Sequence, residues 1–277
     1  MLTKSPDATE HVFDKATHVA PGDSQWSGHT SDDYWAFIGP FGGATAATML
    51  HAIIGHAQRD GDPLSLTVNY CAPIARGPFD LDVRLIRANR STQHWSVELT
   101  QGGEVSAFAT AVFAIRRPSW SHQPRQRPDA TSFEQTRQYP KSALKMSWVH
   151  QYDFRFVEGQ PALDGAPRTE PASPFSKLWI GDTVPRQIDM LSLMSMSDAF
   201  FGRVFHVRGE MVPFGTVSLT TYFHVDAEDL RTEDTRQVLA IADASSFHKS
   251  YANQTGELWS PSGRLLATTQ QITYFKV

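Results

Sequence analysis

The sequence predicts an α+β fold that is built from two tandem units, each with one long apolar helix and an antiparallel sheet. Two observations lead to this prediction. A helical segment followed by four strand-like segments occurs twice along the chain, and short stretches of the two copies align with each other. No helical segment separates the strands within a copy, which favours antiparallel over parallel pairing.

The first copy has its apolar helical segment at residues 44–56, and two glycines, Gly42 and Gly43, precede it. Glycine destabilises a helix interior, so the pair is expected to mark the helix entrance. Strands are also expected before the helix, at residues 16–21 and 32–38. Four strand-like segments follow the helix: "LSLTVNYCAP", "FDLDVRLIRAN", "HWSVELTQ" and "VSAFATAVFAIRR".

The second copy has its helical segment at residues 188–205, with a strand expected before it at 150–159 and the strand "TVSLTTYFHV" after it. "SLTVNY" and "SLTTYF" align with an offset of 153 residues, from Ser65 to Ser218. "FATAVF" and "LATTQQ" align with an offset of 158, from Phe108 to Leu266. One helix wrapped by a curved antiparallel sheet is the hotdog architecture, so the chain is expected to be a double hotdog.

A stretch rich in Pro, Gln, Arg and Ser separates the two copies. It has only weak apolar periodicity, as is typical of a linker. The sequence therefore predicts an N-terminal hotdog at residues 1–117, a linker at 118–147 and a C-terminal hotdog at 148–277. The sheets of the two units can pair at their edges, which would remove exposed strand edges.

Composition excludes several classes of function. The net charge of −4 gives no basic footprint for nucleic acid. Cys71 is the single cysteine, so a reducing, cytoplasmic location is expected without an intrachain disulfide. No apolar run approaches the ~20 residues of a membrane span. HExxH, GxGxxG and GxxxxGK[ST] are all absent, so no metal or nucleotide site is indicated.

Asp198 is the most unusual residue of the second helical segment. Helical spacing places it in a stripe of apolar residues: Met190, Met194, Phe201 and Phe205. Aspartate is a poor residue in the middle of a helix, and an unpaired buried carboxylate is costly. Two interpretations stay open: a structural carboxylate that binds a backbone amide or a basic side chain, or a general base or water-orienting group in a partly apolar cleft.

Two further polar residues are candidates for the same site. The 158-residue offset makes Phe113 the counterpart of Gln271, so the amide faces the second helix where the first copy has an apolar ring. Thr216 begins the strand after that helix. Strand alternation places Thr216 opposite the apolar face, so it can reach Asp198 only if the strand start bends. A hydrogen bond to a neighbouring loop and a simple strand-start hydroxyl are the alternatives.

The helix entrance at Gly42 and Gly43 offers free backbone N–H groups and the positive end of a helix dipole. Such groups can stabilise a developing oxyanion, and glycine allows close approach because it has no Cβ. A plain turn between a strand and the helix is the alternative. Aromatic residues nearby are candidates for an acyl tunnel or for aromatic core: Trp26, Tyr34, Trp35 and Phe37.

These residues together resemble the type II acyl-CoA thioesterases, a family of double hotdogs. The resemblance covers most of the chain and rests on four motifs: Phe41-Gly42-Gly43, Ser197-Asp198, Thr216 and Gln271. It implies an acyl-CoA thioesterase of fatty acid metabolism in which Asp198, Thr216 and Gln271 position the hydrolytic water. It implies no metal or redox cofactor, since coenzyme A belongs to the substrate. One departure is Ile272, where the best-known members have an acidic residue.

Two other functions share this fold. A hotdog hydratase or dehydratase would require a histidine beside the aspartate, and His206 is eight residues beyond Asp198. A non-catalytic acyl-binding double hotdog would lack turnover. A homo-oligomer stays open.

A single working site per chain is expected. The second helix has only Gly181 before it, with Pro185 nearby, and the first helix carries no carboxylate. The counterparts of Gln271 and Thr216 are Phe113 and Pro63, and neither offers an amide or a hydroxyl.

Overall fold

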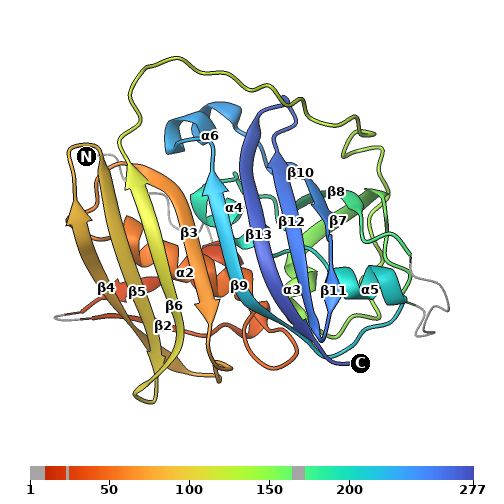
Figure 1. Ribbon diagram of the computed structural model, residues 1–277, viewed down its shortest axis with the longest axis horizontal. Coiled ribbons are helices and arrows are strands. Elements are labelled where there is room, and N and C mark those ends of the chain that lie inside the picture. Colours follow the sequence, from red (N-terminus) through yellow and green to blue (C-terminus); the bar gives the residue numbers. More distant parts are fainter. Residues whose placement is uncertain (1–9, 23–24, 164–171) are drawn as a thin grey trace.

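A computed structural model describes residues 10–22, 25–163 and 172–277. Its strands form a single antiparallel sheet to which both halves of the chain contribute (Figure 1). The first half supplies, from the edge inward, β1 (Val19–Pro21), β2 (Trp26–His29), β4 (Pro78–Ala88), β5 (Thr92–Gln101), β6 (Glu104–Ala114) and β3 (Asp62–Tyr70). The second half continues with β9 (Phe214–Phe223), β13 (Leu265–Phe275), β12 (Tyr251–Trp259), β10 (Gln237–Asp243), β8 (Ser176–Asp182) and β7 (Tyr152–Glu158), with β11 (Phe247–His248) beside β12.

The two halves meet where β3 pairs with β9, and this pairing confirms the internal repeat. Thr67 is paired with Thr220, its own counterpart at the 153-residue offset, and their hydroxyl oxygens lie 3.0 Å apart. A pseudo-twofold axis therefore passes between these two residues. Because β3 and β9 pair with each other, neither half leaves its inner strand edge exposed, as predicted from the sequence. The fold is the double hotdog that the sequence predicted.

The first central helix, α2 (Gly42–Ile54), includes the glycine pair in its first turn, with Phe41 at the N-cap. The second helical segment, expected as one helix over residues 188–205, is broken. Helix α4 (Met190–Met196) ends at Ser197, and α5 (Arg203–Arg208) begins after Gly202. At the break the chain tightens into shorter-range bonds, because the N–H groups of Asp198 and Ala199 donate to carbonyls three residues back, at Ser195 and Met196.

Asp198 consequently lies in the turn that follows α4 and not in the middle of a helix, which corrects the sequence-based placement. Its N–H donates to the carbonyl of Ser195, three residues back. The carboxylate therefore projects from the end of α4, where the backbone is no longer constrained by helix propensity.

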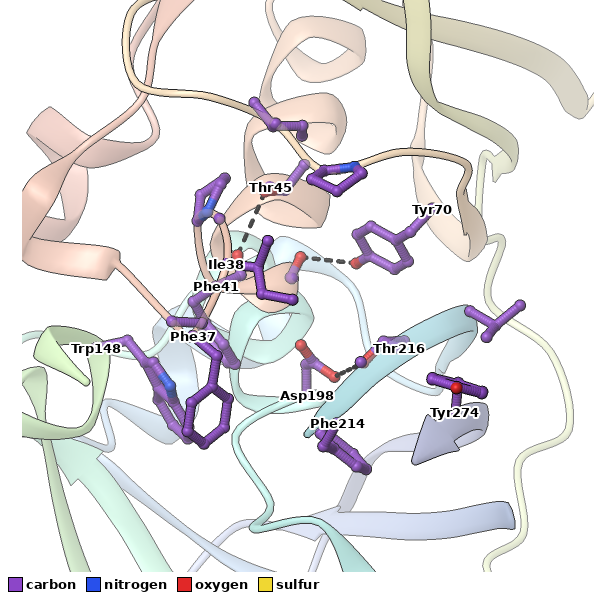
Figure 2. A pocket seen from close by; sticks show the side chains of 18 of the residues that line it. Phe37, Ile38, Phe41, Thr45, Tyr70, Trp148, Asp198, Phe214, Thr216 and Tyr274 are labelled. Carbon is purple, nitrogen blue, oxygen red and sulfur yellow. Dashed lines mark hydrogen bonds between the residues drawn. The ribbon is translucent and has the colours of Figure 1, made fainter. Parts of the chain in front are cut away.

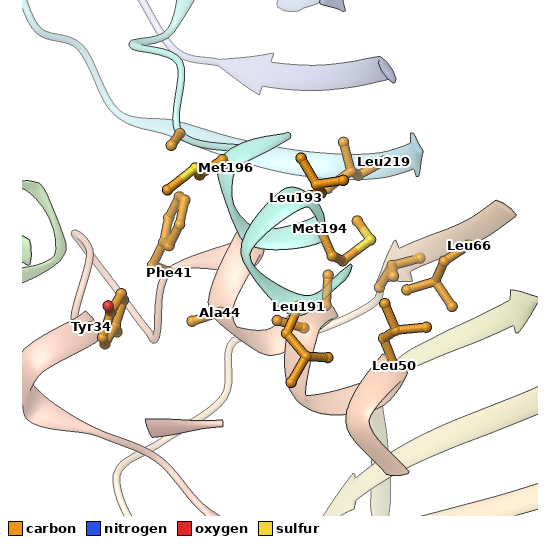
Figure 3. Packing of buried hydrophobic residues seen from close by; sticks show 14 of the residues in the cluster. Tyr34, Phe41, Ala44, Leu50, Leu66, Leu191, Leu193, Met194, Met196 and Leu219 are labelled. Carbon is orange, nitrogen blue, oxygen red and sulfur yellow. The ribbon is translucent and has the colours of Figure 1, made fainter. Parts of the chain in front are cut away.

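Helices α2 and α4 pack against each other beneath the sheet, and they form the middle of the core (Figure 3). Leu50 on α2 and Met194 on α4 are fully buried, as is Leu219 on β9. Gly43 of α2 lies directly against the backbone of α4. A Cβ at this position would collide with the carbonyl oxygen of Ser195, so only glycine fits without displacing α4.

Shorter elements close the ends of the molecule: α1 (Val12–Ala16), η1 (Asp32–Tyr34), α3 (Ser147–Gln151) and α6 (Ala227–Glu233). Residues 32–38, expected as a strand, instead contain the 3₁₀ turn η1 and one isolated bridge between Trp35 and Pro40. The polar side chains at the start of this segment favour a turn, because Ser31 caps η1 through its hydroxyl.

The segment between β6 and α3 is described throughout and contains no helix or strand. It passes over the end of the sheet near α6 and reaches the far side of the second half (Figure 1). The Gln123 side chain accepts from the N–H of Leu265 at 2.8 Å, and Trp179 donates to the carbonyl of Thr131 at 2.8 Å. The unit boundaries at 117 and 148 stay a prediction. Within the described ranges, no helix has the length and apolarity that crossing a membrane requires.

We expect Gly43→Ala to lower the free energy of unfolding by about 1–3 kcal/mol, because the new methyl group must push α4 away from α2. Urea denaturation measures this loss. Gly215→Ala is the matched control, since a Cβ there meets no atom within 4 Å. Equal stability of the two variants would show that the packing of α2 against α4 does not require glycine at position 43.

Candidate active site

Asp198, Thr216 and Gln271 meet in one hydrogen-bonded group. The Gln271 side-chain amide donates to Oδ1 of Asp198, and also to the Thr216 hydroxyl at 2.6 Å. Thr216 in turn donates to Oδ1 of Asp198 at 3.3 Å. Residues that are 73 positions apart in the sequence thus converge on a single carboxylate oxygen.

Thr216 reaches this group because β9 carries a β-bulge next to it. Ser218 pairs with Ile272 of β13, but Thr216 pairs with Thr273, so Val217 is left as an extra residue. Beyond the bulge the alternation of β9 is reversed, and Thr216 joins the face that Leu219 occupies. Simple alternation, which placed Thr216 on the opposite face, was therefore wrong.

The equivalent bulge occurs in the first half, where Leu64 is skipped between Pro63 and Ser65. Leu64 and Val217 are separated by the same 153-residue offset, so the bulge belongs to the repeat. Pro63 is thus the counterpart of Thr216, as expected from the sequence. The site in the second half uses a backbone feature that both halves possess.

Gln271 is buried in β13 and is itself oriented by a second amide. Gln254 on β12 donates to the Gln271 carbonyl oxygen at 2.6 Å, which leaves the Gln271 NH₂ group to face Asp198 and Thr216.

The strand register also corrects the residue that was predicted as the first-half counterpart of Gln271. Gln271 pairs with Leu219, and the corresponding pair in the first half is Leu66 with Ala111. The first half therefore has alanine at this position rather than the predicted Phe113.

The electrostatics of Asp198 are set by opposing effects. Burial raises the pKa of its carboxyl group from 3.8 to about 7, because the charged form loses hydration. Hydrogen bonds from Gln271 and Thr216 act in the opposite direction, as does one from the backbone of Gly43. A carboxyl group with a pKa near neutrality can accept and release a proton at neutral pH.

The entrance of α2 contacts the other oxygen of this carboxylate. A Cβ on Gly42 would lie 2.7 Å from Oδ2 of Asp198, so glycine permits this approach. The peptide that joins Gly42 to Gly43 is held from both sides. Its N–H donates to Asp198, and its carbonyl accepts from the Tyr70 hydroxyl at 2.7 Å.

Tyr70 was missed by the sequence analysis. It is the last residue of β3, and its phenol reaches the first turn of α2 (Figure 2). Burial raises its pKa well above the ordinary value, and the nearby Asp198 charge adds to this rise, so the hydroxyl remains a donor. The only available signal was its position at the end of a strand that leads back toward the helix entrance, and that signal does not single out one tyrosine.

The carboxylate opens into a cavity of about 350 Å³ at the boundary between the two halves (Figure 2). Its walls are rich in aromatic rings: Phe37, Phe41, Trp148, Phe200, Phe201, Phe205 and Phe214. Among the aromatic residues singled out from the sequence, only Phe37 lines it; Tyr34 belongs to the core. None of the described lining residues is a histidine. His206 is buried instead near Phe156.

Family comparisons identify the class of protein that this fold and site define. Residues 31–114 match the model of the acyl-CoA thioesterase N-terminal domain, and residues 107–275 match the model of the C-terminal domain. The chain therefore belongs to the acyl-CoA thioesterase family and is a thioester hydrolase.

Solved structures agree with the fold. A protein of unknown function with a hot dog fold from Alicyclobacillus acidocaldarius has 38% sequence identity over 97% of this chain and 99% of its own, with a TM-score of 0.91. The acyl-CoA thioesterase II TesB2 of Mycobacterium marinum shares the fold at 19% identity, covering 96% and 98% of the two chains, with a TM-score of 0.73. No curated protein sequence matches the chain at a significant level.

We expect Gly42→Ala to reduce kcat/KM by about 10²-fold, because the methyl group must displace the Asp198 carboxylate or the Tyr70 ring. Steady-state hydrolysis of an acyl-CoA measures the loss. Gly215→Ala, which lines the same cavity but meets open space, should retain activity. If Gly42→Ala hydrolyses as fast as Gly215→Ala, the close contact between the helix entrance and the carboxylate has no role in turnover.

We expect kcat/KM to fall as the pH is lowered through about 7, and Gln271→Leu to move this limb to higher pH. The reason is that the amide hydrogen bond lowers the pKa of Asp198, so its removal leaves the burial effect less opposed. pH–rate profiles measure the shift. Gln270→Leu is the matched control, because that neighbouring side chain is exposed. An unchanged limb in Gln271→Leu would contradict the coupling.

Proposed function

We propose that the chain hydrolyses acyl-CoA thioesters with a water molecule that Asp198, Thr216 and Gln271 hold and activate. The observation that supports this proposal is the convergence of three polar side chains on one point of an otherwise aromatic cavity, next to the entrance of α2. Burying a polar group costs free energy unless it forms hydrogen bonds with other protein groups or with a ligand. Their arrangement suits a small polar reactant.

In the proposed reaction, Asp198 accepts a proton from the water while the water oxygen attacks the thioester carbonyl carbon. The carbonyl then re-forms as the C–S bond breaks, and the proton held by Asp198 passes to the departing thiolate, which releases the free acid and the thiol of coenzyme A. Thr216 and Gln271 orient the water and hold the carboxylate in one rotamer. General-base assistance of this kind contributes about 10²–10⁴-fold to a rate.

The oxyanion would be stabilised at the entrance of α2. The Gly43 N–H is already directed at Asp198, so we assign the oxyanion contact to the Gly42 N–H and to the positive end of the helix dipole. Tyr70 keeps this first turn in position through the Gly42 carbonyl. The acyl chain would lie along the aromatic walls, where burial of apolar surface stabilises it.

An acyl-CoA panel of increasing chain length, with released thiol detected by a colorimetric dye, tests the proposal. Turnover of at least one member is the expected result. Binding of acyl-CoA without thiol release would instead support a non-catalytic acyl-binding double hotdog. Formation of a hydroxyacyl product from an enoyl-CoA would support a hydratase, which the absence of histidine from the described cavity lining disfavours.

We expect Asp198→Asn to lower turnover by about 10²–10⁴-fold, with far less than half of the activity remaining. A loss this complete also indicates one working site per chain, since a second working site would preserve about half. Thiol release under saturating substrate measures it.

The same variant distinguishes catalysis from a structural role. The folded-state pKa of Asp198 is raised above its unfolded value, so its contribution to stability is fully present below about pH 4 and is lost as the pH rises through about 7. At pH 8, Asp198→Asn should therefore be at least as stable as the wild type. A large loss of thermal stability at pH 8 would favour the structural interpretation.

A further inference from the structure

A second cavity, of about 590 Å³, lies at the opposite ends of the two central helices. The C-terminal end of α2, the loop before β3, the N-terminal end of α4 and helix α6 form its walls. The candidate active site uses the other ends of the same helices. Asp62 lines the second cavity and Gly215 lines the first, and these two residues are counterparts at the 153-residue offset. The two cavities are therefore related by the internal repeat.

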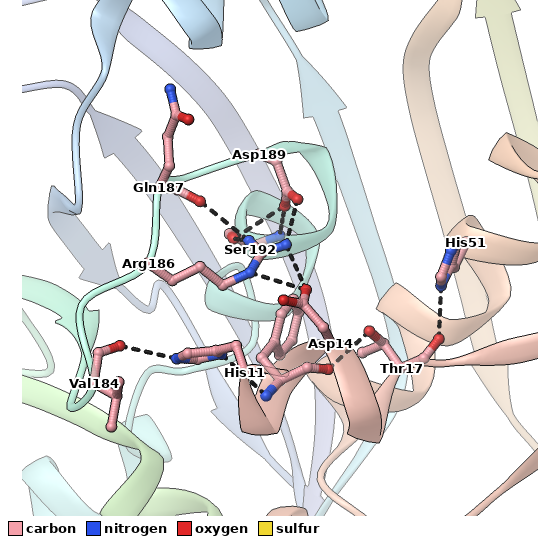
Figure 4. A network of polar contacts seen from close by, with 10 residues as sticks. His11, Asp14, Thr17, His51, Val184, Arg186, Gln187, Asp189 and Ser192 are labelled. Atoms are coloured by element: carbon pink, nitrogen blue, oxygen red, sulfur yellow. Dashed lines mark hydrogen bonds and ion pairs between the residues drawn. The ribbon is translucent and has the colours of Figure 1, made fainter. Parts of the chain in front are cut away.

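The second cavity lacks the hydrolytic groups. Its helix entrance is already closed by protein groups, because Asp189 caps α4 by accepting from the N–H of Ser192 at 2.8 Å. Arg186 binds Asp189 at 2.6 Å and Asp14 at 2.7 Å, so its charge is balanced within the protein (Figure 4). The counterpart of Gln271 is Ala111. The second cavity therefore has room for a ligand but lacks the polar groups proposed for hydrolysis.

What remains is an apolar floor, with Arg59 and Arg231 among the charged residues at its rim. The floor consists of Ile54, Ile188, Met190, Leu191 and Leu230. On the rim, Arg59 donates to two backbone carbonyls, those of Ile54 and Gly61, and no carboxylate pairs with it in the described part of the chain. Arg231 pairs only with Glu228 among the described residues, and both side chains are 69% exposed, so this pair is weak.

We propose that this second cavity is a non-catalytic binding site for a fatty carboxylate. Its volume falls within the roughly 300–1,000 Å³ of small-molecule sites. The hydrocarbon chain would cover the apolar floor, and the carboxylate would bind the guanidinium groups of Arg59 and Arg231. Asp62 also lines the cavity, and its carboxylate accepts from the N–H of Ala227 at the start of α6. Apart from the Arg186–Asp189 pair, the charged lining then consists of two guanidinium groups and one carboxylate. The free acid is also the class of product that thioester hydrolysis releases.

Calorimetric titration with dodecanoate tests the site. The catalytic cavity is first saturated with S-dodecyl-CoA, a thioether that cannot be hydrolysed. We expect about one further equivalent of dodecanoate to bind, and the double variant Arg59→Glu/Arg231→Glu to weaken this binding about tenfold or more. Arg236→Glu is the matched control, because that exposed arginine pairs with Asp234 outside the cavity. Arg231→Glu alone serves if the double variant does not fold.

The proposal is overturned if dodecanoate no longer binds once the catalytic cavity is filled, or if charge reversal leaves the additional binding unchanged. Its failure is separable from failure of the proposed function. The rim variants should keep the wild-type kcat, since no rim residue lines the catalytic cavity. Asp198→Asn should lose turnover and still bind the additional dodecanoate.

Discussion

The contact between α2 and α4 at Gly43 is the constraint on which the rest of the structure depends. Because Gly43 has no side chain, the helix backbones can touch, and the turn after α4 is brought against the first turn of α2. The carboxylate of Asp198 then lies between the helix entrance and the two strands that carry Thr216 and Gln271. A wider separation would leave this carboxylate without its backbone donor.

Two opposing effects act on the pKa of this buried carboxylate, and their balance determines the protonation of the site. Loss of hydration favours the protonated form, whereas three hydrogen-bond donors favour the ionised form. The balance places the pKa close to neutrality, as the proposed role of Asp198 as a general base requires. A fully apolar site would keep Asp198 protonated, and an exposed one would leave it ionised and weakly basic.

The internal repeat provides two similar scaffolds, and the two halves differ in the groups that surround their helix ends. The β-bulge is present in both copies, at Leu64 and Val217. Beside it, one copy has threonine and the other has proline. One helix entrance meets a carboxylate from the other half, and the other is capped by its own Asp189. The same fold therefore carries the proposed catalytic groups at one end and a cavity with an apolar floor at the other.

The sequence by itself determined the repeat, the two central helical segments, the pairing of the units and the residue types of the site, because apolar periodicity and internal alignment are local properties. It also selected Asp198, Thr216 and Gln271 as candidates. Only the tertiary structure decided that the second helix ends at Ser197, that a bulge turns Thr216 inward, that Ala111 is the counterpart of Gln271, and that Tyr70 reaches Gly42. These features depend on strand register and on contacts between segments far apart in the chain, and a one-residue shift in pairing changes the face of every following side chain.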